Sequence, residues 1–305
     1  MLGNRVAKSH KKLFAAFEKK NIGAFRLYDR DIPEIRAVVD WFEGHLVVGE
    51  YARALTDAAP SWLPAMGEAC AKALGLPEGR VHLRRRRTRP AEGQRYERLA
   101  ETNARLEVRE GDLKFLVNLD DYLDVGLFPD HRETRKRIRV EASGRTFLNL
   151  FSYTGSFTVA AARGGAKSSL TVDTSGLYLD WARENLSVNG VHTSAHELLR
   201  LDAREALRRV RNAGRTFELA FVDPPSFSSK GPDGGDFDVQ RDHRALLEEA
   251  LGVLAPGGVL WFSTNHQRFE PDLDGLGATE NTRETVPVDF RNETVHRTWR
   301  LVKAP

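Results

Sequence analysis

The chain has 305 residues, of which 41% are apolar, and this is enough to bury a substantial core in one large or two modest domains. No apolar run reaches the roughly 18 residues of a membrane-spanning helix, and the opening residues lack the apolar segment and cleavage site of a secretory signal, so we expect a cytoplasmic protein. Cys70 is the only cysteine, which excludes an internal disulfide and a cysteine-rich zinc site.

The net charge of +3 conceals an uneven distribution of basic residues. Residues 1–110 hold 21 Lys and Arg against 15 Asp and Glu, whereas residues 111–305 hold 25 against 28. Clusters of basic residues attract polyanions, although a single cluster is as often a solvated face. The clusters are Lys8, Lys11, Lys12, Lys19 and Lys20; Arg84, Arg85, Arg86, Arg87 and Arg89; and Arg132, Arg135, Lys136, Arg137 and Arg139. Three clusters in one chain favour a nucleic acid as partner.

The first hundred residues predict a small mixed α/β unit. The expected elements are a basic amphipathic helix at 2–20, strands at 24–28, 35–41 and 46–51, a helix at 62–74 and a strand at 81–85. Residues 88–104 are rich in Arg, Glu, Gly and Gln and are typical of an exposed linker. We therefore predict one domain over 1–104 and a second over 105–305, which opens with a hairpin at 105–108 and 113–118.

From residue 146 onward, strand and helix patterns alternate. The expected strands are 146–151, 168–173, 195–201, 217–222 and 258–264, and the expected helices are 156–163, 176–189, 203–212 and 240–254. Parallel neighbours need crossover connections, so this alternation predicts a doubly wound, mostly parallel sheet. Two antiparallel strands at 278–287 and 296–303 are expected to complete its edge.

Four of these strands end in residues suited to a nucleoside-bearing ligand. The first turns into a helix through Gly155, which is either a plain tight turn or a cradle of free amides. The second ends in Asp173, at the spacing where an acidic side chain binds ribose hydroxyls. The third ends in Asp202, either an acceptor for an adenine amine or a helix N-cap. The fourth stops at Asp223, where Pro224 and Pro225 force a turn.

The spacing of glycines narrows the choice of ligand. A dinucleotide site needs G-x-G-x-x-G after the first strand, and residues 151–157 contain one glycine. A nucleoside without phosphates fits better. S-adenosylmethionine offers a ribose to Asp173, an adenine to Asp202 and an amino-acid end to the first turn.

The motifs NLFSYTGSFT, VDTS, FVDPPSFS, FDVQRDH at 237–243 and LDVGLFPDHR at 123–132 together resemble class I methyltransferases acting on 23S rRNA. The likeness is greatest to the guanine-N7 half of bifunctional bacterial enzymes, and it includes RLYDRDIP at 26–33 and VDFRN at 288–292. It implies a Rossmann-like sheet, S-adenosylmethionine as cofactor, and an RNA-binding or accessory role for residues 1–104. It also implies 23S rRNA as partner, unassembled or in a partly assembled subunit, with no membrane association. The separate RNA-binding domain and guanine-N2 half of those enzymes have no counterpart in this sequence.

The resemblance also implies site residues. The expected cofactor-binding residues are Phe128, Asp130, His131, Arg132, Asn149, Phe151, Ser152, Tyr153, Thr154, Gly155, Asp173, Thr174, Ser175, Asp202, Ala203 and Asp223. The expected catalytic residues are Asp223, Pro224, Pro225 and Phe227. The expected RNA contacts are Arg84, Arg85, Arg86, Arg87, Ser226, Arg241 and His243, of which the last two are otherwise braces of the site loop or plain helix-start residues with neither role. No metal site is expected, because His131 has no second His or Cys at ligand spacing.

The chemistry of the acceptor atom favours nitrogen over carbon. Methylation of cytosine C5 requires a thiolate that adds to the ring, and the related subfamily carries this cysteine after its last core strand, where this chain has Asn265. Guanine N7 attacks directly through its in-plane lone pair, and alignment supplies the catalysis. We expect backbone carbonyls of the Asp223-Pro224 turn to hold the base and Phe227 to stack on it, unless Phe227 packs in the core. The alternatives are a 5-methylcytosine or guanine-N2 methyltransferase and a non-catalytic RNA-binding or ribosome-assembly module.

Overall fold

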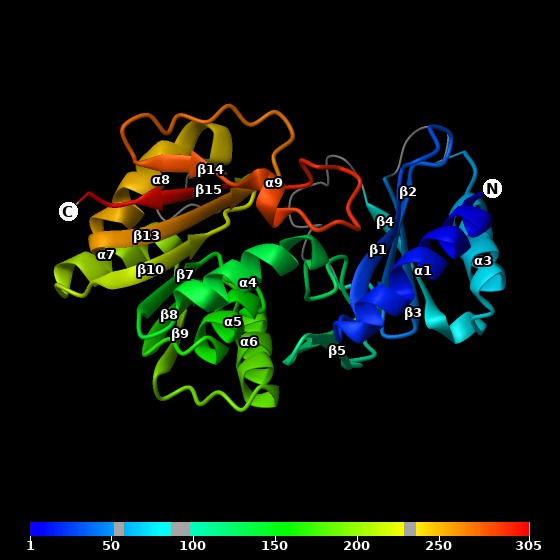
Figure 1. Cartoon of the computed structure of the whole chain (residues 1–305), viewed down its shortest axis with the longest axis horizontal. Helices are drawn as coiled ribbons and strands as arrows, with labels where there is room; N and C mark the ends of the chain where they lie inside the picture. The colour runs from blue at the N-terminus through cyan, green and yellow to red at the C-terminus, as the bar shows by residue number, and fades with distance from the viewer. Residues whose placement is uncertain (52–57, 87–97, 229–235, 305) are drawn as a thin grey trace. The chain divides into compact units, whose positions relative to one another are not determined.

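The computed structural model describes residues 1–51, 58–86, 98–228 and 236–304, and the chain forms two compact units (Figure 1). Unit 1 comprises Met1–Pro129 and Val288–Asn292, and unit 2 comprises Asp130–Pro287 and Glu293–Pro305. The division therefore falls at 129 rather than at 104. The reason is that the hairpin expected to open the second domain is bonded to unit 1, where Gly23 N donates to Arg109 O at 2.8 Å.

Unit 1 is a four-stranded sheet packed against two helices. The strand order is β1-β2-β3-β4, with β1, β2 and β3 antiparallel and β4 parallel to β3. Its elements are α1 (Leu2–Lys19), β1 (Ala24–Asp29), β2 (Ala37–Phe42), β3 (His45–Tyr51), α3 (Trp62–Leu74), the 3-10 turn η1 (Glu78–Arg80), β4 (Val81–Arg86), and the hairpin β5 (Leu106–Glu110) and β6 (Leu113–Val117). These bounds confirm the helices, strands and hairpin predicted for this part of the chain.

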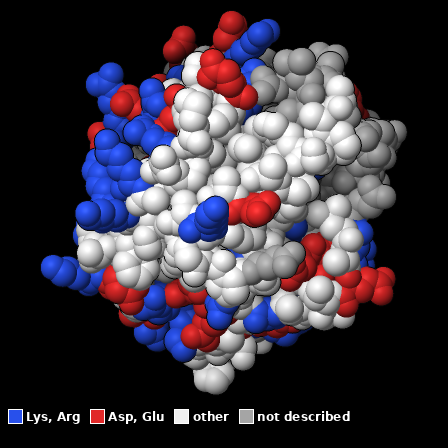
Figure 2. All heavy atoms as spheres, turned by 90° about the vertical axis from the view of Figure 1, so that its right-hand side faces the viewer, with Lys and Arg blue, Asp and Glu red and all other residues white. Residues whose placement is uncertain are grey.

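The helix α1 buries its apolar side against the sheet and against α3. Val6 and Phe17 lie in the core with Phe25 and Trp41. The two helices approach so closely at Gly3 that a Cβ there would lie 2.4 Å from the carbonyl oxygen of Ala69. The lysines of α1 consequently lie on its exposed side. Figure 2 shows one face of the molecule, on which Lys and Arg side chains gather toward the left edge of the view.

A buried carboxylate anchors the segment that follows the hairpin. The Asp121 side chain accepts hydrogen bonds from the backbone amides of Thr102 and Asn103, both at 2.8 Å, and from Nδ2 of Asn118 at 2.9 Å. Burial alone would raise the pKa of this carboxyl, but the hydrogen bonds outweigh it and hold the pKa of Asp121 well below its ordinary value.

Unit 2 is a seven-stranded sheet of order β14-β15-β13-β10-β7-β8-β9. The five strands from β13 to β9 are parallel, β15 is antiparallel to β13, and β14 is antiparallel to β15. The first half of this unit contains η3 (Pro129–His131), α4 (Arg132–Glu141), β7 (Thr146–Leu150), α5 (Ser156–Arg163), β8 (Ser168–Asp173), α6 (Gly176–Val188), β9 (His196–Arg200) and α7 (Ala203–Asn212). The second half contains β10 (Phe217–Val222), β11 (Phe227–Ser228), β12 (Phe237–Asp238), α8 (Val239–Gly252), β13 (Leu254–Thr264), β14 (Ala278–Glu280), α9 (Thr282–Thr285) and β15 (Arg297–Val302).

Helices cover both faces of this sheet. On one face, residues of α4 and α5 such as Ile138 and Phe157 pack on Phe147, Phe221 and Trp261. On the other face, α7 and α8 pack on the strands through a second cluster that contains Leu207 and Leu246. This layered arrangement confirms the predicted doubly wound sheet with an antiparallel edge. Within the described ranges, no helix combines the length and apolar character needed to cross a bilayer.

Two local elements differ from the prediction. The helix α4 was not predicted, because its sequence RETRKRIRVE is almost entirely charged and Ile138 alone gives it an apolar face. The predicted strand 278–287 is a short strand followed by the helix α9. After β14 the chain closes one helical turn, in which Val286 N donates to the carbonyl oxygen of Thr282 at 3.1 Å.

We expect Asp121→Asn to destabilise the protein by about 2–4 kcal/mol at pH 7, because the amide nitrogen cannot accept the bonds that the carboxylate accepts. The folded pKa of Asp121 lies below the unfolded one, so its stabilisation is present above about pH 4 and is lost as the pH falls. Urea unfolding at pH 7 and pH 3 should therefore show a difference between wild type and variant that shrinks in acid. Glu68→Gln, at an exposed acid on α3, is the matched control; an equal effect of both changes would contradict the assignment.

Candidate active site

The candidate site lies where the sheet changes direction. From β7 the chain proceeds to β8 and β9 on one side, and it then returns to place β10 on the other side of β7. Leu150 at the end of β7 pairs with Val222 at the end of β10, so the turns that follow both strands start side by side. In open α/β sheets, ligands bind at this switch point, outside the carboxyl ends of the strands. The fold therefore brings the first and fourth predicted strand ends together.

The turn after β7 has an unusual backbone. Phe151, Tyr153 and Gly155 have φ values of 56°, 50° and 72°, in the left-handed region that side chains rarely adopt. Such strain persists where the surroundings impose it and is concentrated at functional sites. At Gly155 a side chain is excluded outright, because a Cβ would lie 2.7 Å from the Cβ of Ala182 on α6. Glycine is thus required for the close packing of this turn.

Asp173 ties the first turn to the second strand end. Its Oδ2 accepts a hydrogen bond from Tyr153 N at 2.9 Å, and its Oδ1 accepts one from Ser175 N at 2.9 Å. Burial raises the pKa of this carboxyl. The backbone amide of Thr174 also bonds to this carboxylate, which leaves about one of its four lone-pair positions for a ribose hydroxyl while it holds both loops. The predicted ribose contact is compatible with this geometry and stays a prediction.

Ser152 supplies a direct test of whether the turn suits a polar ligand. Its Oγ is buried at the end of β7 and makes no hydrogen bond to any described residue, which is unfavourable unless a ligand group bonds to it. Asn149 resembles it in part: its Nδ2 donates to Thr158 Oγ1 at 3.0 Å, but its buried Oδ1 also makes no hydrogen bond to any described residue. Ser152 and Asn149 each keep a buried polar atom that a ligand group would satisfy, and the cofactor-binding roles of both stay predictions.

The third strand end confirms the N-cap interpretation of Asp202. Its Oδ1 accepts from Arg204 N at 2.9 Å and from Glu205 N at 3.2 Å, at the start of α7. Both bonds use one oxygen, so Oδ2 is not committed to the cap. A contact with an adenine amine stays a prediction. The neighbouring Ala203 is buried beneath this turn.

Three more predicted cofactor residues shape the loops around the site. Ser175 Oγ caps α6 by accepting from Tyr178 N at 3.3 Å. Thr174 O accepts from Arg200 Nε at 3.1 Å, and the buried Thr154 accepts through its carbonyl oxygen from the side chain of Asn185 at 2.9 Å. These contacts fix the backbone and leave the cofactor role of the three residues a prediction.

Asp223 lies beside two stacked histidines. His131 Nε2 is 3.6 Å from Asp223 Oδ2, and the His131 ring stacks on His296 with centroids 4.1 Å apart. His296 Nδ1 in turn lies 3.1 Å from Asp130 Oδ2. Burial raises the pKa of the Asp223 carboxyl to about 6, and burial also lowers the pKa of His131 well below its ordinary value. The charge of Asp223 therefore depends on pH near neutrality.

This histidine pair was not predicted, because His296 is far from His131 in the sequence. The fold brings Asp130, His131 and His296 together, with one possible ligand atom from each within 4.8 Å of the others. The two rings, however, are nearly parallel, at 14° to each other, so their in-plane lone pairs do not converge on one point. Thr285 Oγ1 also lies 3.3 Å from Nε2 of His296. The geometry favours a hydrogen-bonded network over a metal centre.

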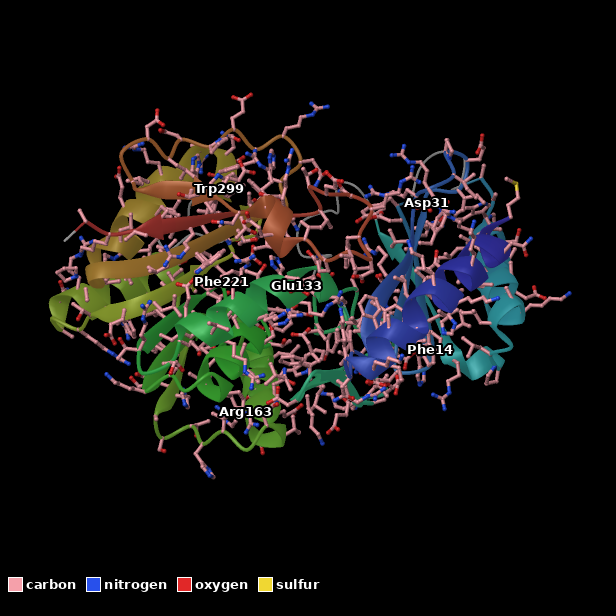
Figure 3. All side chains as sticks on the ribbon, in the orientation of Figure 1. Phe14, Asp31, Glu133, Arg163, Phe221 and Trp299 are labelled. Carbon is pink, nitrogen blue, oxygen red and sulfur yellow. The ribbon has the colours of Figure 1, made fainter. Side chains whose placement is uncertain are left out.

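The arginines between residues 132 and 139 do not form one solvated face. Arg132 and Arg135 are buried, and the Arg135 guanidinium lies 5.8 Å from the centroid of the Phe157 ring. That ring stacks on Phe221 of β10, which is labelled in Figure 3. The predicted third basic cluster is therefore divided between core and surface. Phe128 belongs to unit 1 and is 40% exposed. The cofactor roles predicted for Phe128 and Arg132 stay predictions.

The Asp-Pro-Pro turn leads directly to an exposed aromatic ring. Phe227 is 50% exposed, so the alternative of simple core packing is excluded. Ser226 Oγ donates to Asn265 Oδ1 at 2.9 Å, which connects this turn to the end of β13. Phe227 also pairs with Asp238 in the small ladder of β11 and β12. The ring is therefore held on a short strand while its face stays accessible.

Several predicted RNA contacts are not supported. Arg84 is buried and bonds to the carbonyl oxygens of Leu83, at 2.9 Å, and Leu119. Arg85 pairs with the buried Glu50 at 2.7 Å. Arg84 is thus structural, because a buried guanidinium needs protein acceptors. The side chain of Arg86 and the whole of Arg87 lie outside the described part of the chain.

His243 is a brace. It is buried, its Nδ1 donates to Val239 O at 2.8 Å, and its Nε2 accepts from Asp272 N at 2.9 Å. With both nitrogens used inside the protein, the predicted RNA contact is not supported. Arg241 is exposed and pairs with Asp236 and Asp242 at 3.2 and 2.8 Å, so its contact with RNA stays a prediction.

Comparison with known proteins agrees with this geometry. A model of the S-adenosylmethionine-dependent methyltransferase family matches residues 25–296. The chain is 40% identical over 304 residues to ribosomal RNA large subunit methyltransferase K of Neisseria meningitidis serogroup B, covering 98% of this chain and 86% of that protein. It is 44% identical over 308 residues to ribosomal RNA large subunit methyltransferase K/L of Pseudomonas putida strain GB-1, covering 99% of this chain but only 42% of that protein.

A solved structure shows the same fold. SMU.776, a candidate methyltransferase crystallised in complex with SAH, superposes with a TM-score of 0.77, covering 99% of this chain and 80% of that one. The two sequences are 22% identical, so the likeness concerns the fold.

The raised pKa of Asp223 predicts a pH-dependent stability. The pKa of this carboxyl is about 6 in the folded state and about 3.9 in the unfolded state. Between these pH values the folded protein therefore binds more protons than the unfolded chain. The contribution of Asp223 to the free energy of unfolding should therefore fall by up to about 3 kcal/mol as the pH rises from about 4 to about 6. The lowered pKa of His131 contributes in the opposite direction over the same range, so the quantity to follow is the difference between wild type and the Asp223 variant. Asp223→Asn should flatten this fall in urea titrations, whereas Asp180→Asn, at an exposed acid of α6, should keep it. Parallel slopes for all three proteins would count against the assignment.

Proposed function

This chain belongs to the S-adenosylmethionine-dependent methyltransferase family, and on that premise we propose that it methylates 23S ribosomal RNA at N7 of a guanine. The substrate class is taken from relatives named as ribosomal RNA large subunit methyltransferases. We choose a base as the methyl acceptor because the exposed ring of Phe227 follows the Asp-Pro-Pro turn at the switch point, where it would stack on a base.

The strand ends suit the cofactor. S-adenosylmethionine supplies a methyl group on a positively charged sulfonium. Asp173 would hold the ribose hydroxyls and Asp202 the adenine amine, while the buried Ser152 Oγ would bond to a polar group in the first turn. The backbone amides of Ser152, Tyr153 and Gly155 already donate within the protein, to Val172 O, Asp173 Oδ2 and Ser152 O, so the Ser152 hydroxyl is the polar group that this turn would offer.

The acceptor base would lie against the turn after β10. Pro224 and Pro225 have no backbone N–H, so the turn presents carbonyl oxygens that accept from the amino and imino groups of guanine. Phe227 would stack on the base, a contact worth roughly 1–3 kcal/mol in single-stranded RNA recognition. Stacking and carbonyl contacts together fix the plane of the base and the direction of its N7 lone pair.

The position of Cys70 argues against methylation of a carbon atom. Cys70 is fully buried in unit 1, and burial raises the pKa of its thiol to about 12, so almost no thiolate exists at neutral pH. At the end of β13, Asn265 bonds to Ser226 and offers no nucleophile. A 5-methylcytosine mechanism therefore lacks its covalent catalyst.

Transfer to N7 needs no base. The N7 lone pair forms the new N–C bond, the electrons of the breaking S–C bond return to sulfur, and the positive charge passes from sulfur to the purine ring. A carboxylate at Asp223 would stabilise the cation before and after transfer. Exclusion of water and alignment supply the remaining catalysis.

One observation favours a second candidate, the exocyclic N2 of guanine. Methylation of an amine releases a proton, and the Asp223 carboxyl, with its pKa near 6, is suited to accept a hydrogen bond or a proton there. The two products have the same mass, so separation of the nucleosides is needed to distinguish them.

We expect the purified protein to convert an unmodified 23S transcript to a product containing 7-methylguanosine when supplied with methyl-deuterated S-adenosylmethionine. Chromatography and mass spectrometry of the digested RNA would identify the nucleoside, and aniline scission after borohydride treatment would locate it. Cys70→Ser should act like wild type. Label in N2-methylguanosine or 5-methylcytidine would replace the proposed acceptor, and RNA binding without label would favour the non-catalytic module.

Phe227→Ala should lower kcat/KM for RNA by about 10-fold or more, because it removes the stacking surface. The side chain is half exposed, so the melting temperature and the affinity for S-adenosylmethionine should change little. Phe227→Tyr preserves the ring and should retain most activity. A loss of activity that appears equally in both variants would indicate that the ring does not stack on the base.

A further inference from the structure

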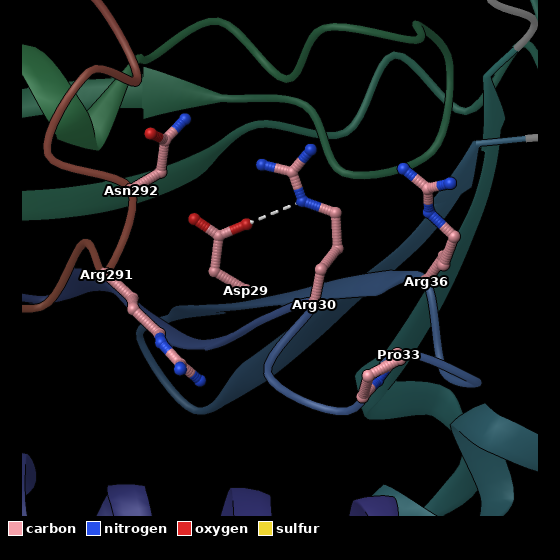
Figure 4. A pocket seen from close by; sticks show the side chains of 6 residues that line it. All are labelled: Asp29, Arg30, Pro33, Arg36, Arg291 and Asn292. Atoms are coloured by element: carbon pink, nitrogen blue, oxygen red, sulfur yellow. Dashed lines mark hydrogen bonds and ion pairs between the residues drawn. The ribbon is translucent and has the colours of Figure 1, made fainter.

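Unit 1 contains a hollow of about 590 Å³ to which the proposed catalytic site assigns no role. Its lining comes from the end of β1, from the connection to β2 and from the 288–292 segment (Figure 4). The lining residues are Asp29, Arg30, Pro33, Arg36, Arg291 and Asn292. Three of the six are arginines, so the hollow is suited to an anion.

The hollow is built by a long-range connection within unit 1. Arg26 N on β1 donates to Asp289 Oδ2 at 2.9 Å, and the Arg26 guanidinium lies 4.5 Å from the centroid of the Phe290 ring. These contacts fix the 288–292 segment against β1 and thereby place Arg291 beside the connection that carries Arg30 and Arg36. Two motifs that are distant in the sequence thus form one surface.

The charges of the lining do not cancel. Asp29 is its only acid, and its buried carboxylate is engaged by Arg30 Nε at 3.0 Å. Arg36 makes no ion pair with any described residue. Arg291 lies 3.6 Å from Asp31, but Asp31 is held more closely by Arg5 at 2.7 Å. The hollow therefore presents an excess of guanidinium groups to the solvent.

The backbone of Arg30 gives a second, independent reason to regard this as a binding site. Its φ is 56°, a conformation in which glycine or asparagine is normally found. Its guanidinium also lies 5.9 Å from the centroid of the Tyr51 ring. An arginine kept in a strained backbone, and fixed by a carboxylate and a ring, is a preorganised donor.

A smaller hollow of about 280 Å³ adjoins the first and shares Asp29 and Arg291 with it. It adds the basic side chains of Arg5 and Lys12 from α1 and of Arg26 from β1, and also the acids Asp31 and Asp289. Arg5 is paired with Asp31 at 2.7 Å, whereas Lys12 makes no ion pair with any described residue. Each depression therefore keeps a cation that no described acid pairs with, Arg36 in the first and Lys12 in the second, an arrangement that suits a chain of anions better than one isolated ion.

We propose that these two hollows, the arginine track, bind consecutive phosphates of a single-stranded RNA segment. Guanidinium groups bind phosphate oxygens through two parallel hydrogen bonds. Tyr28 lies in the lining of the second hollow, but its side chain is buried and its hydroxyl donates to Ile35 O at 2.9 Å, so its ring is not available to stack on a base. The arginine track would increase the affinity for RNA and fix the position of its backbone, without selecting a base sequence. The identity of the strand as ribosomal RNA rests on the proposed function, whereas the phosphate chemistry does not.

The test measures binding of a fluorescein-labelled 12-nucleotide RNA to the full chain by fluorescence anisotropy between 50 and 200 mM salt. Arg36→Gln and Arg291→Gln should each weaken binding about 3- to 10-fold at low salt and reduce the slope of log K against log salt by about 0.7. Arg209→Gln, on α7, is the matched control, because Arg209 is 62% exposed and Arg291 63%. It should leave both quantities unchanged.

Each outcome decides one question. Unchanged affinity and slope in both variants would overturn the arginine track. Inorganic phosphate that displaces the RNA at micromolar concentration would show an isolated anion site and would overturn the proposed strand. Calorimetry with S-adenosylmethionine should give wild-type affinity for both variants, because the strand ends are intact. If the variants lose RNA affinity while wild type methylates no ribosomal RNA, the proposed function fails and the track stands.

Discussion

The parallel pairing of β7 with β10 is the constraint on which the site depends. Its register places Leu150 beside Val222, and the chain leaves these strands in opposite directions along the sheet. Two turns therefore begin at one point without a helix between them, and a ligand is able to touch both. The left-handed turn, the Asp173 bridge and the Asp-Pro-Pro carbonyls all derive their positions from this pairing. Their chemistry follows from residue type, but their proximity follows from topology alone.

The strand ends were predictable because each one is marked by residues next to it in the sequence. Apolar runs that stop at an acid, a glycine or a pair of prolines indicate where strands end, and parallel strands end on one side of a sheet. The partners of Asp223 were not predictable in this way. His296 is a single histidine directly before β15, far along the chain, and only the folded sheet stacks it on His131. Helix α4 was missed for a related reason, because its buried face contains arginines rather than an apolar stripe.

Charge clusters proved to be the least reliable guide. The run beginning at Arg84 contains one buried arginine and one held by Glu50, because alternate residues of a strand face opposite sides and their partners come from elsewhere. The arginine track instead combines residues that no single stretch of sequence groups together. Arg30, Arg36 and Arg291 become neighbours through the return of the 288–292 segment to β1. Composition indicated a polyanion as partner, but the three-dimensional arrangement decides which cations face it.

That return also affects how the protein is made. Residues 288–292 belong to unit 1, whereas the residues on both sides of them belong to unit 2, so the chain passes between the units three times. Domains generally fold as they leave the ribosome, N-terminal first. Here unit 1 cannot be completed until residue 292 has been synthesised, after six of the seven strands of the larger sheet. The RNA-facing hollow is therefore completed late in synthesis, and a chain cut at residue 129 would lack one wall of it.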